Sequence, residues 1–296
     1  MERKGYKMKK LAAIFLTLIS ISGCTVADDT PKFDESLSAE YKANSAYGSA
    51  RHIHGRTLIV SIYADDPSNR WNPLSAVDKD TIEQTLYYLG IATDWISEQA
   101  GRYGADAEFI YDWKENHDLK YSTTFMTELE KDDGTYTLTV YDQQKRYLRN
   151  NVDTDALLEK YDADNIIYMF FINSDFSNPA NPVTSPRAYL CGDEFYTDHI
   201  NLCVRFDDYY VTAPSSYAHE ILHCFGAYDL YYENQVITKD YVIHCAESGS
   251  RDIMYYVTSG DKIYSEFTEL DAYYVGLTDY SQEVEEWDLG PSDYQQ

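Results

Sequence analysis

Residues 219–229 hold two histidines four positions apart, a glutamate directly after the first, and an aspartate six positions after the second. On an α-helix, positions i and i+4 lie on nearly the same face, so His219 and His223 can present two imidazole nitrogens to one metal ion. Glu220 then lies beside the metal without binding it, where its carboxylate can accept a proton from water. The spacing predicts a zinc site with its own general base.

Gly226 and Asp229 extend this pattern beyond the second histidine. A glycine lets the chain leave the helix with positive φ, and the following turn can bring Asp229 back as a third ligand. Three protein ligands leave the fourth position open for water, which is typical of a catalytic zinc site. Glu247 is an alternative third ligand, in the manner of thermolysin-like enzymes. We expect one catalytic Zn²⁺ ion, with Asp229 as the preferred third ligand.

The pattern of residues 219–229 resembles the zinc signature of the metzincin metalloproteases, in the snapalysin-like variant whose last ligand is aspartate. Metzincins carry a methionine turn beneath the metal, and Met254 in residues 252–256 matches it. Some place a tyrosine two residues later, where its hydroxyl stabilises the oxyanion, and Tyr256 occupies that position. The resemblance implies a zinc endopeptidase. Core packing for Met254 and a structural role for Tyr256 are the alternatives.

The resemblance extends in order of elements over residues 55–280, although only the two motifs match closely. Cys224 inside the signature and the segment at 121–150 depart from the common pattern. The implied fold is α/β (α+β), a twisted mixed sheet of about five strands with a backing helix, an active-site helix and a C-terminal helix under the cleft.

The hydrophobic pattern predicts the elements that must position the motif. A β-branched run at 57–63, a helix that starts at Asp78 or Asp80 and reaches Gly101 or Gly104, and a strand at 107–113 form a βαβ unit. The remaining expected elements are a hairpin of 121–129 with 135–141, a helix at 153–161, a central strand at 165–172, strands at 187–191 and 200–206, the motif helix capped by Ser215 or Ser216, and a helix at 265–276.

The N-terminus indicates export. Five basic residues precede an apolar run at 11–21, which is too short to span a bilayer, and Cys24 follows at the point where a signal peptidase cuts. Residues 21–24 resemble the bacterial lipobox, which implies a lipid anchor on Cys24 at the cell surface. An ordinary secretory signal is the alternative. We expect a signal peptide at 1–23, a flexible tether at 24–51, a peptidase domain at 52–280 and an acidic tail at 281–296.

Four further cysteines lie outside the signal region: Cys191, Cys203, Cys224 and Cys245. Four cysteines in an oxidising compartment allow three disulfide pairings. Proximity in sequence favours Cys191 with Cys203 and Cys224 with Cys245.

The charge balance limits the partners. The chain has 50 acidic and 24 basic residues, for a net charge of −26, so it repels nucleic acid. The expected partners are a protein or peptide substrate and, through the anchor, a membrane; we expect a monomer. A competing hypothesis from another class is a surface lipoprotein that binds a ligand on a peptidase scaffold without catalysis. The intact base Glu220 favours the enzyme.

Overall fold

The computed structural model describes residues 49–50, 53–129, 138–175, 187–189, 198–205 and 211–292. The predicted signal peptide, Cys24 and Cys191 lie outside these ranges, as do His52 and most of the tether. All described residues fall in one structural unit, residues 31–296. None of the described helices is long and apolar enough to cross a membrane.

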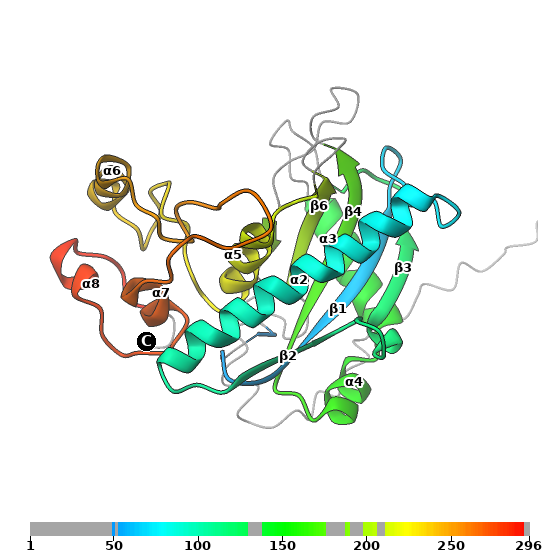
Figure 1. Ribbon diagram of the computed structural model, residues 1–296, viewed down its shortest axis with the longest axis horizontal. Coiled ribbons are helices and arrows are strands. Elements are labelled where there is room, and N and C mark those ends of the chain that lie inside the picture. The colour runs from blue at the N-terminus through cyan, green and yellow to red at the C-terminus, as the bar shows by residue number, and fades with distance from the viewer. Residues whose placement is uncertain are drawn as a thin grey trace, which may run out of the picture. The chain divides into compact units, whose positions relative to one another are not determined.

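A mixed sheet of six strands forms the centre of the fold (Figure 1). Its order is β2-β1-β4-β6-β5, and β3 also pairs with β1. All pairs are parallel except β5 with β6, so the predicted mixed sheet and its central strand are confirmed. The strands are β1 (Gly55–Asp65), β2 (Ala107–Tyr111), β3 (Lys120–Thr124), β4 (Asn165–Asp175), β5 (Arg187–Tyr189) and β6 (His199–Arg205).

Both faces of the sheet are buried, because successive side chains of a strand point to opposite sides. In β4, Ile167, Met169 and Phe171 pack in one apolar cluster, while Ile166 and Phe170 pack in another. The first cluster includes residues of α2 (Ala76–Arg102) and α5 (Pro214–Cys224), and the second includes residues of α3 (Leu138–Asn151) and α4 (Thr154–Tyr161). The motif helix α5 therefore shares a face of the sheet with the long helix α2 (Figure 1).

The βαβ unit β1-α2-β2 is confirmed, but α2 begins earlier than Asp78. Its N-cap is Ser75, whose hydroxyl accepts a hydrogen bond from the Asp78 backbone N–H. The Asp78 carboxylate instead accepts from the Asn72 backbone N–H and pairs with Arg205 at the end of β6. Because serine caps as well as aspartate, the sequence alone does not decide between the two positions.

The predicted hairpin of 121–129 with 135–141 is wrong. Lys120–Thr124 forms β3, which pairs in parallel with β1, and residues 138–151 form the helix α3. Val140, Gln144 and Leu148 are buried at helical spacing. Over a stretch of only seven residues, alternating apolar and polar positions do not distinguish such a helix from a strand. Residues 130–137 lie outside the described part of the chain. The predicted helix at 153–161 is confirmed as α4, with Asp153 as its N-cap.

The C-terminal third adds three short helices to the face that carries α5: α6 (Lys239–Ser248), α7 (Glu269–Tyr274) and α8 (Gln282–Glu286). The predicted C-terminal helix is present as α7. Residues 281–292, predicted as an acidic tail, instead pack on the domain: Leu289 is buried, and the Gly290 backbone N–H donates to the Val236 carbonyl. At the other end, Ser49 and Ala50, predicted as tether, are buried too.

Candidate metal centre

Helix α5 starts at Pro214, with Ala213 as its N-cap. Proline suits this first position because the N–H that it lacks would have no partner within the helix. The predicted capping role of Ser215 or Ser216 is therefore wrong, because both lie inside the helix. The Ser215 hydroxyl instead donates to the Thr258 carbonyl at 2.5 Å, which ties α5 to the loop after residue 254. Tyr217, Ile221 and other apolar residues of α5 pack in the core, so the helix is fixed in rotation and direction.

The end of α5 brings the three predicted ligands together. Gly226 has φ 103°, as predicted for the exit from the helix, and the turn returns Asp229 to the two histidines. The His219 and His223 Nε2 atoms are 3.1 Å apart, and the Asp229 Oδ1 atom lies 3.1 Å from the first and 3.0 Å from the second. Among the described residues, this is the one cluster of three or more ligating side chains that could hold a metal ion.

The outer nitrogen of each histidine faces a backbone carbonyl. His219 Nδ1 is 2.9 Å from the Ile253 oxygen, and His223 Nδ1 is 2.7 Å from the Ala227 oxygen. A carbonyl can only accept, so each Nδ1 carries a proton, and each Nε2 faces inward towards the Asp229 carboxylate. Two Nε2 atoms and one carboxylate oxygen thus converge, and a cation bound among them would contact all three.

The separations fit zinc. In a tetrahedral site with bonds of about 2.0–2.1 Å, neighbouring ligand atoms lie about 3.3 Å apart. The three observed separations of 3.0–3.1 Å are slightly shorter, and the two-nitrogen, one-carboxylate donor set is one that zinc accepts. Both histidines also have the outer hydrogen bond that metal-binding histidines require.

Electrostatics favour an ionised Asp229. Burial removes water from its carboxylate and by itself raises the pKa, but the hydrogen bonds from His219 and His223 outweigh this effect. The pKa of Asp229 is therefore held well below its ordinary value. The group is a carboxylate throughout the range in which peptidases work, as a metal ligand must be.

Met254 lies in a turn directly behind the site and is fully buried. The Met254 carbonyl accepts from the Leu230 backbone N–H at 3.0 Å, next to Asp229, while the preceding Ile253 carbonyl holds His219. The turn is thus bonded to two of the three ligand positions. Its buried side chain packs in the core, as the alternative for Met254 expected, and the role of a methionine turn beneath a metal stays a prediction.

Glu220 is 5% exposed and follows His219 on α5. The pKa values of two other residues show which groups lie near Glu220. Burial is the main cause that raises the pKa of the Tyr231 hydroxyl, the charge of Asp229 is the next, and the charge of Glu220 also contributes. Burial is also the main cause that raises the pKa of the Cys224 thiol, followed by the charge of Asp198 and then by that of Glu220. The charge of the predicted base thus acts on Tyr231, two residues after Asp229, and on Cys224 of the same helix.

Tyr231 is the site residue that the sequence analysis missed. Its ring lies nearly parallel to that of His219, with centroids 6.3 Å apart. Burial, and next the charge of the nearby Asp229, raises the pKa of the Tyr231 hydroxyl. The same two causes raise the pKa of the neighbouring Tyr232, which contacts the Tyr231 ring edge-on. The predicted Tyr256 is as exposed as Tyr231, at 52% against 51%, but its recorded contacts are backbone bonds to Asp252 and Ser265 and none is to a predicted ligand. In the sequence, the available signal for a role of Tyr231 at the site was its position two residues after Asp229.

Two other predicted groups lie elsewhere. Glu247, the alternative third ligand, is exposed on α6 and does not join the cluster. Cys224 and Cys245 are free thiols, in contrast to the disulfide predicted from sequence proximity. Cys224 is buried near Asp198 and Glu220, whereas Cys245 is buried near Asp252 and Tyr241, so the two thiols occupy different surroundings. The pairing of Cys203 with Cys191 lies outside the described residues.

No family model matches the chain, and no curated protein matches it. The chemistry of the site is therefore what indicates a function.

Proposed function

We propose that the protein is a zinc-dependent endopeptidase of the metzincin type, which hydrolyses peptide bonds in protein or peptide substrates. The observation that carries the proposal is the convergence of the His219 and His223 Nε2 atoms and the Asp229 Oδ1 atom within 3.1 Å, with a buried glutamate on the same helix. The mixed sheet backed by α2, the turn at Met254 and the short C-terminal helix α7 support the metzincin assignment.

His219, His223 and Asp229 would hold the ion and leave one coordination position open. Zinc, when bound, is a Lewis acid that makes water a nucleophile at neutral pH and polarises a carbonyl oxygen. Glu220 accepts the proton of the attacking water and passes it to the leaving amine, which completes the cleavage of the peptide bond. Glu220 is buried and directly follows the ligand His219 on α5.

Tyr231 is the proposed hydrogen-bond donor to the oxyanion. Its hydroxyl lies at the metal ligand Asp229, and burial followed by the charge of Asp229 raises the pKa of that hydroxyl, so it keeps its proton. Tyr256 is the alternative implied by the metzincin resemblance. The contact with Asp229 favours Tyr231.

Replacing Tyr231 with phenylalanine is expected to lower kcat about 10- to 100-fold with little change in zinc content, because one donor to the transition state is lost. Steady-state kinetics on a quenched fluorescent peptide measure this loss. Tyr256→Phe is the matched variant, with an expected change of less than about threefold. A larger loss in Tyr256→Phe than in Tyr231→Phe contradicts the assignment to Tyr231.

The substrate is expected to bind in an extended conformation along an edge strand. Of the two candidate strands, β6 pairs with β4 on one side and β5 on the other, so within the described residues β5 (Arg187–Tyr189) is the edge. A peptide would add there by backbone hydrogen bonds, above the helix that carries the ligands.

Cleavage of casein by the full-length protein tests the proposal against a non-catalytic surface lipoprotein. The account predicts fragments that disappear after treatment with a zinc chelator and return when zinc is added. Intact casein under all three conditions, with zinc bound, would favour the surface-binding protein.

We also propose that Cys24 carries a lipid anchor that holds the protein at the bacterial cell surface. The basic residues and apolar run before it, and the lipobox-like residues 21–24, support this location. In cells that produce the protein, labelled palmitate is expected to enter the wild type and to be absent from Cys24→Ala, which also leaves the membrane fraction. Equal label in both proteins contradicts the anchor.

A further inference from the structure

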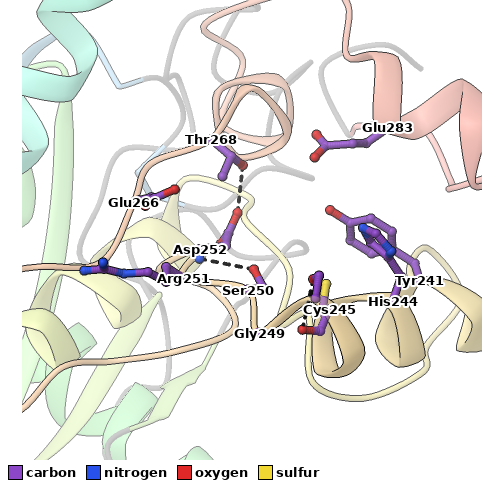
Figure 2. Close-up of a pocket in the computed structure, with 11 residues that line it drawn as sticks. Tyr241, His244, Cys245, Gly249, Ser250, Arg251, Asp252, Glu266, Thr268 and Glu283 are labelled. Atoms are coloured by element: carbon purple, nitrogen blue, oxygen red, sulfur yellow. Dashed lines mark hydrogen bonds between the residues drawn. The ribbon is translucent and has the colours of Figure 1, made fainter.

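Two buried carboxyl groups meet behind the metal site. Asp252 begins the turn that contains Met254, and Asp271 lies in the first turn of α7; they are 3% and 2% exposed. One Asp252 oxygen accepts from the Met254 backbone N–H at 2.7 Å, and the other accepts from the Thr268 hydroxyl at 2.7 Å. Figure 2 shows the bond between Asp252 and Thr268.

Thr268 joins the two acids. It is the N-cap of α7, where its backbone N–H donates to the Asp271 carboxyl at 3.0 Å and its hydroxyl accepts from the Asp271 backbone N–H at 3.3 Å. The two carboxyl groups thus meet at one residue, Thr268, and each affects the pKa of the other. Two buried carboxyl groups this close repel each other when both are ionised, so the arrangement favours one proton between them.

The surroundings keep that proton in place. Burial, and next the charge of Asp252, raises the pKa of Asp271 well above its ordinary value. Burial also raises the pKa of Asp252, to about 6, although its hydrogen bonds oppose the shift. Near neutral pH, Asp271 is therefore the protonated donor and Asp252 the carboxylate.

The pair connects to the metal ligands through a short path. Asp252 fixes the backbone N–H of Met254, and the adjacent Ile253 carbonyl accepts from Nδ1 of His219. The Met254 carbonyl accepts from the backbone N–H of Leu230, next to Asp229. The orientation of the turn at residues 252–254 thus decides the orientation of the His219 ring.

We propose that Asp252, Thr268 and Asp271 form a positioning network for the ligand His219, in which one proton shared by the two carboxyl groups holds the turn at residues 252–254 against α7. This inference rests on the proposed metal site. Loss of the shared proton leaves two buried negative charges in contact, and their repulsion separates the turn from the helix. The His219 ring then loses its fixed direction, and zinc affinity falls.

Other ionisable groups surround the pair. Asp252 and Thr268 line a pocket of about 370 Å³, through which solvent protons can reach the network (Figure 2). Glu283 of α8 faces the same pocket, and its negative charge helps to raise the pKa of Asp252. The remaining titratable or charged residues on this side are Tyr241, His244 and Cys245 of α6, together with Arg251 and Glu266.

The sign of the pH effect follows from the raised pKa values. A carboxyl group whose pKa is raised by folding stabilises the folded chain fully below its unfolded pKa, and this stabilisation is lost as the pH rises through its folded value. The metal-free wild type should therefore lose thermal stability as the pH rises from about 4, the ordinary pKa of aspartate, to well above 6. Asp271→Asn cannot lose a proton, yet its amide can still donate to Asp252.

The experiment compares melting temperatures of metal-free, full-length wild type and Asp271→Asn across that pH range. The expected result is a steeper alkaline decline in the wild type. Glu98→Gln is the matched control: Glu98 is exposed on α2 and does not line this pocket, so the variant should retain the wild-type slope. Parallel curves for wild type and Asp271→Asn, or an equally flattened curve for Glu98→Gln, overturn the shared proton.

Zinc affinity then tests positioning. At about pH 7, Asp271→Leu, which has similar volume but no donor, should bind zinc about tenfold more weakly than Asp271→Asn in competition with a chromophoric chelator. Equal affinities of these two variants overturn the positioning role even if the melting curves differ. Failure of the wild type to bind zinc instead refutes the proposed metal site, while the metal-free melting curves still report on the proton.

Discussion

Replacing Glu220 with glutamine is expected to lower kcat/KM for peptide hydrolysis by about 10²- to 10⁴-fold while zinc stays bound. Glutamine has nearly the same shape, so the helix and the three ligands keep their positions. Its amide cannot accept the proton of the attacking water, so the step that needs a base loses it. The effect should appear in kcat, because ground-state binding of the peptide does not depend on this proton transfer.

The measurement is peptide hydrolysis together with zinc content for wild type and Glu220→Gln. Glu233→Gln is the matched control, because Glu233 is exposed and lies in the loop shortly after Asp229. It should retain activity within about twofold, as is usual for a surface substitution. A Glu220→Gln enzyme within about tenfold of wild type, with normal zinc content, contradicts the assigned base.

The second large effect concerns the third ligand. Asp229→Ala is expected to weaken zinc binding at least about 100-fold and to abolish hydrolysis, since loss of a ligand should cost more than loss of an outer hydrogen bond. The variant also removes the carboxylate oxygen that lies 3.1 Å from His219 Nε2 and 3.0 Å from His223 Nε2. Glu247→Ala is the matched variant: its side chain is exposed on α6, so we expect wild-type affinity and activity.

Zinc competition with a chromophoric chelator measures both affinities. The opposite order, with zinc lost in Glu247→Ala and retained in Asp229→Ala, would contradict Asp229 as the third ligand and support Glu247 in its place. Asp229→Asn adds a finer test, because an amide oxygen can still bind the ion but carries no charge. An affinity between those of wild type and Asp229→Ala is expected.

The sequence predicts much of this site because its key spacings are local. His219 and His223 lie one helical turn apart, and Gly226 must end the helix before Asp229 can return to them. The strands β1 and β4 are equally predictable, because continuous apolar runs between turn residues fit a sheet buried on both faces. These features depend on residues close in sequence.

Features that depend on distant contacts are harder to predict. α3 resembles a strand over a short window, and its helical character depends on Val140, Gln144 and Leu148 packing against the sheet. The free thiols of Cys224 and Cys245 follow from the separate places of α5 and α6, which spacing along the chain does not reveal.

The same reasoning explains Tyr231 and the acid pair. Tyr231 is one of 30 tyrosines, and only the folded turn brings its hydroxyl to Asp229. Asp252 and Asp271 are two of 50 acidic residues, and their contact depends on the cap of α7. The contacts of such common residue types depend on the fold, so the amino-acid composition does not reveal them.

Titration of metal-free, full-length protein with zinc, with peptide hydrolysis followed at each addition, tests the central claim most directly. The account predicts that the rate rises in proportion to zinc and stops rising at one ion per chain, the occupancy of a single site built from His219, His223 and Asp229. A protein that binds one zinc ion and cleaves no peptide at any occupancy, or that cleaves equally well without zinc, would contradict it.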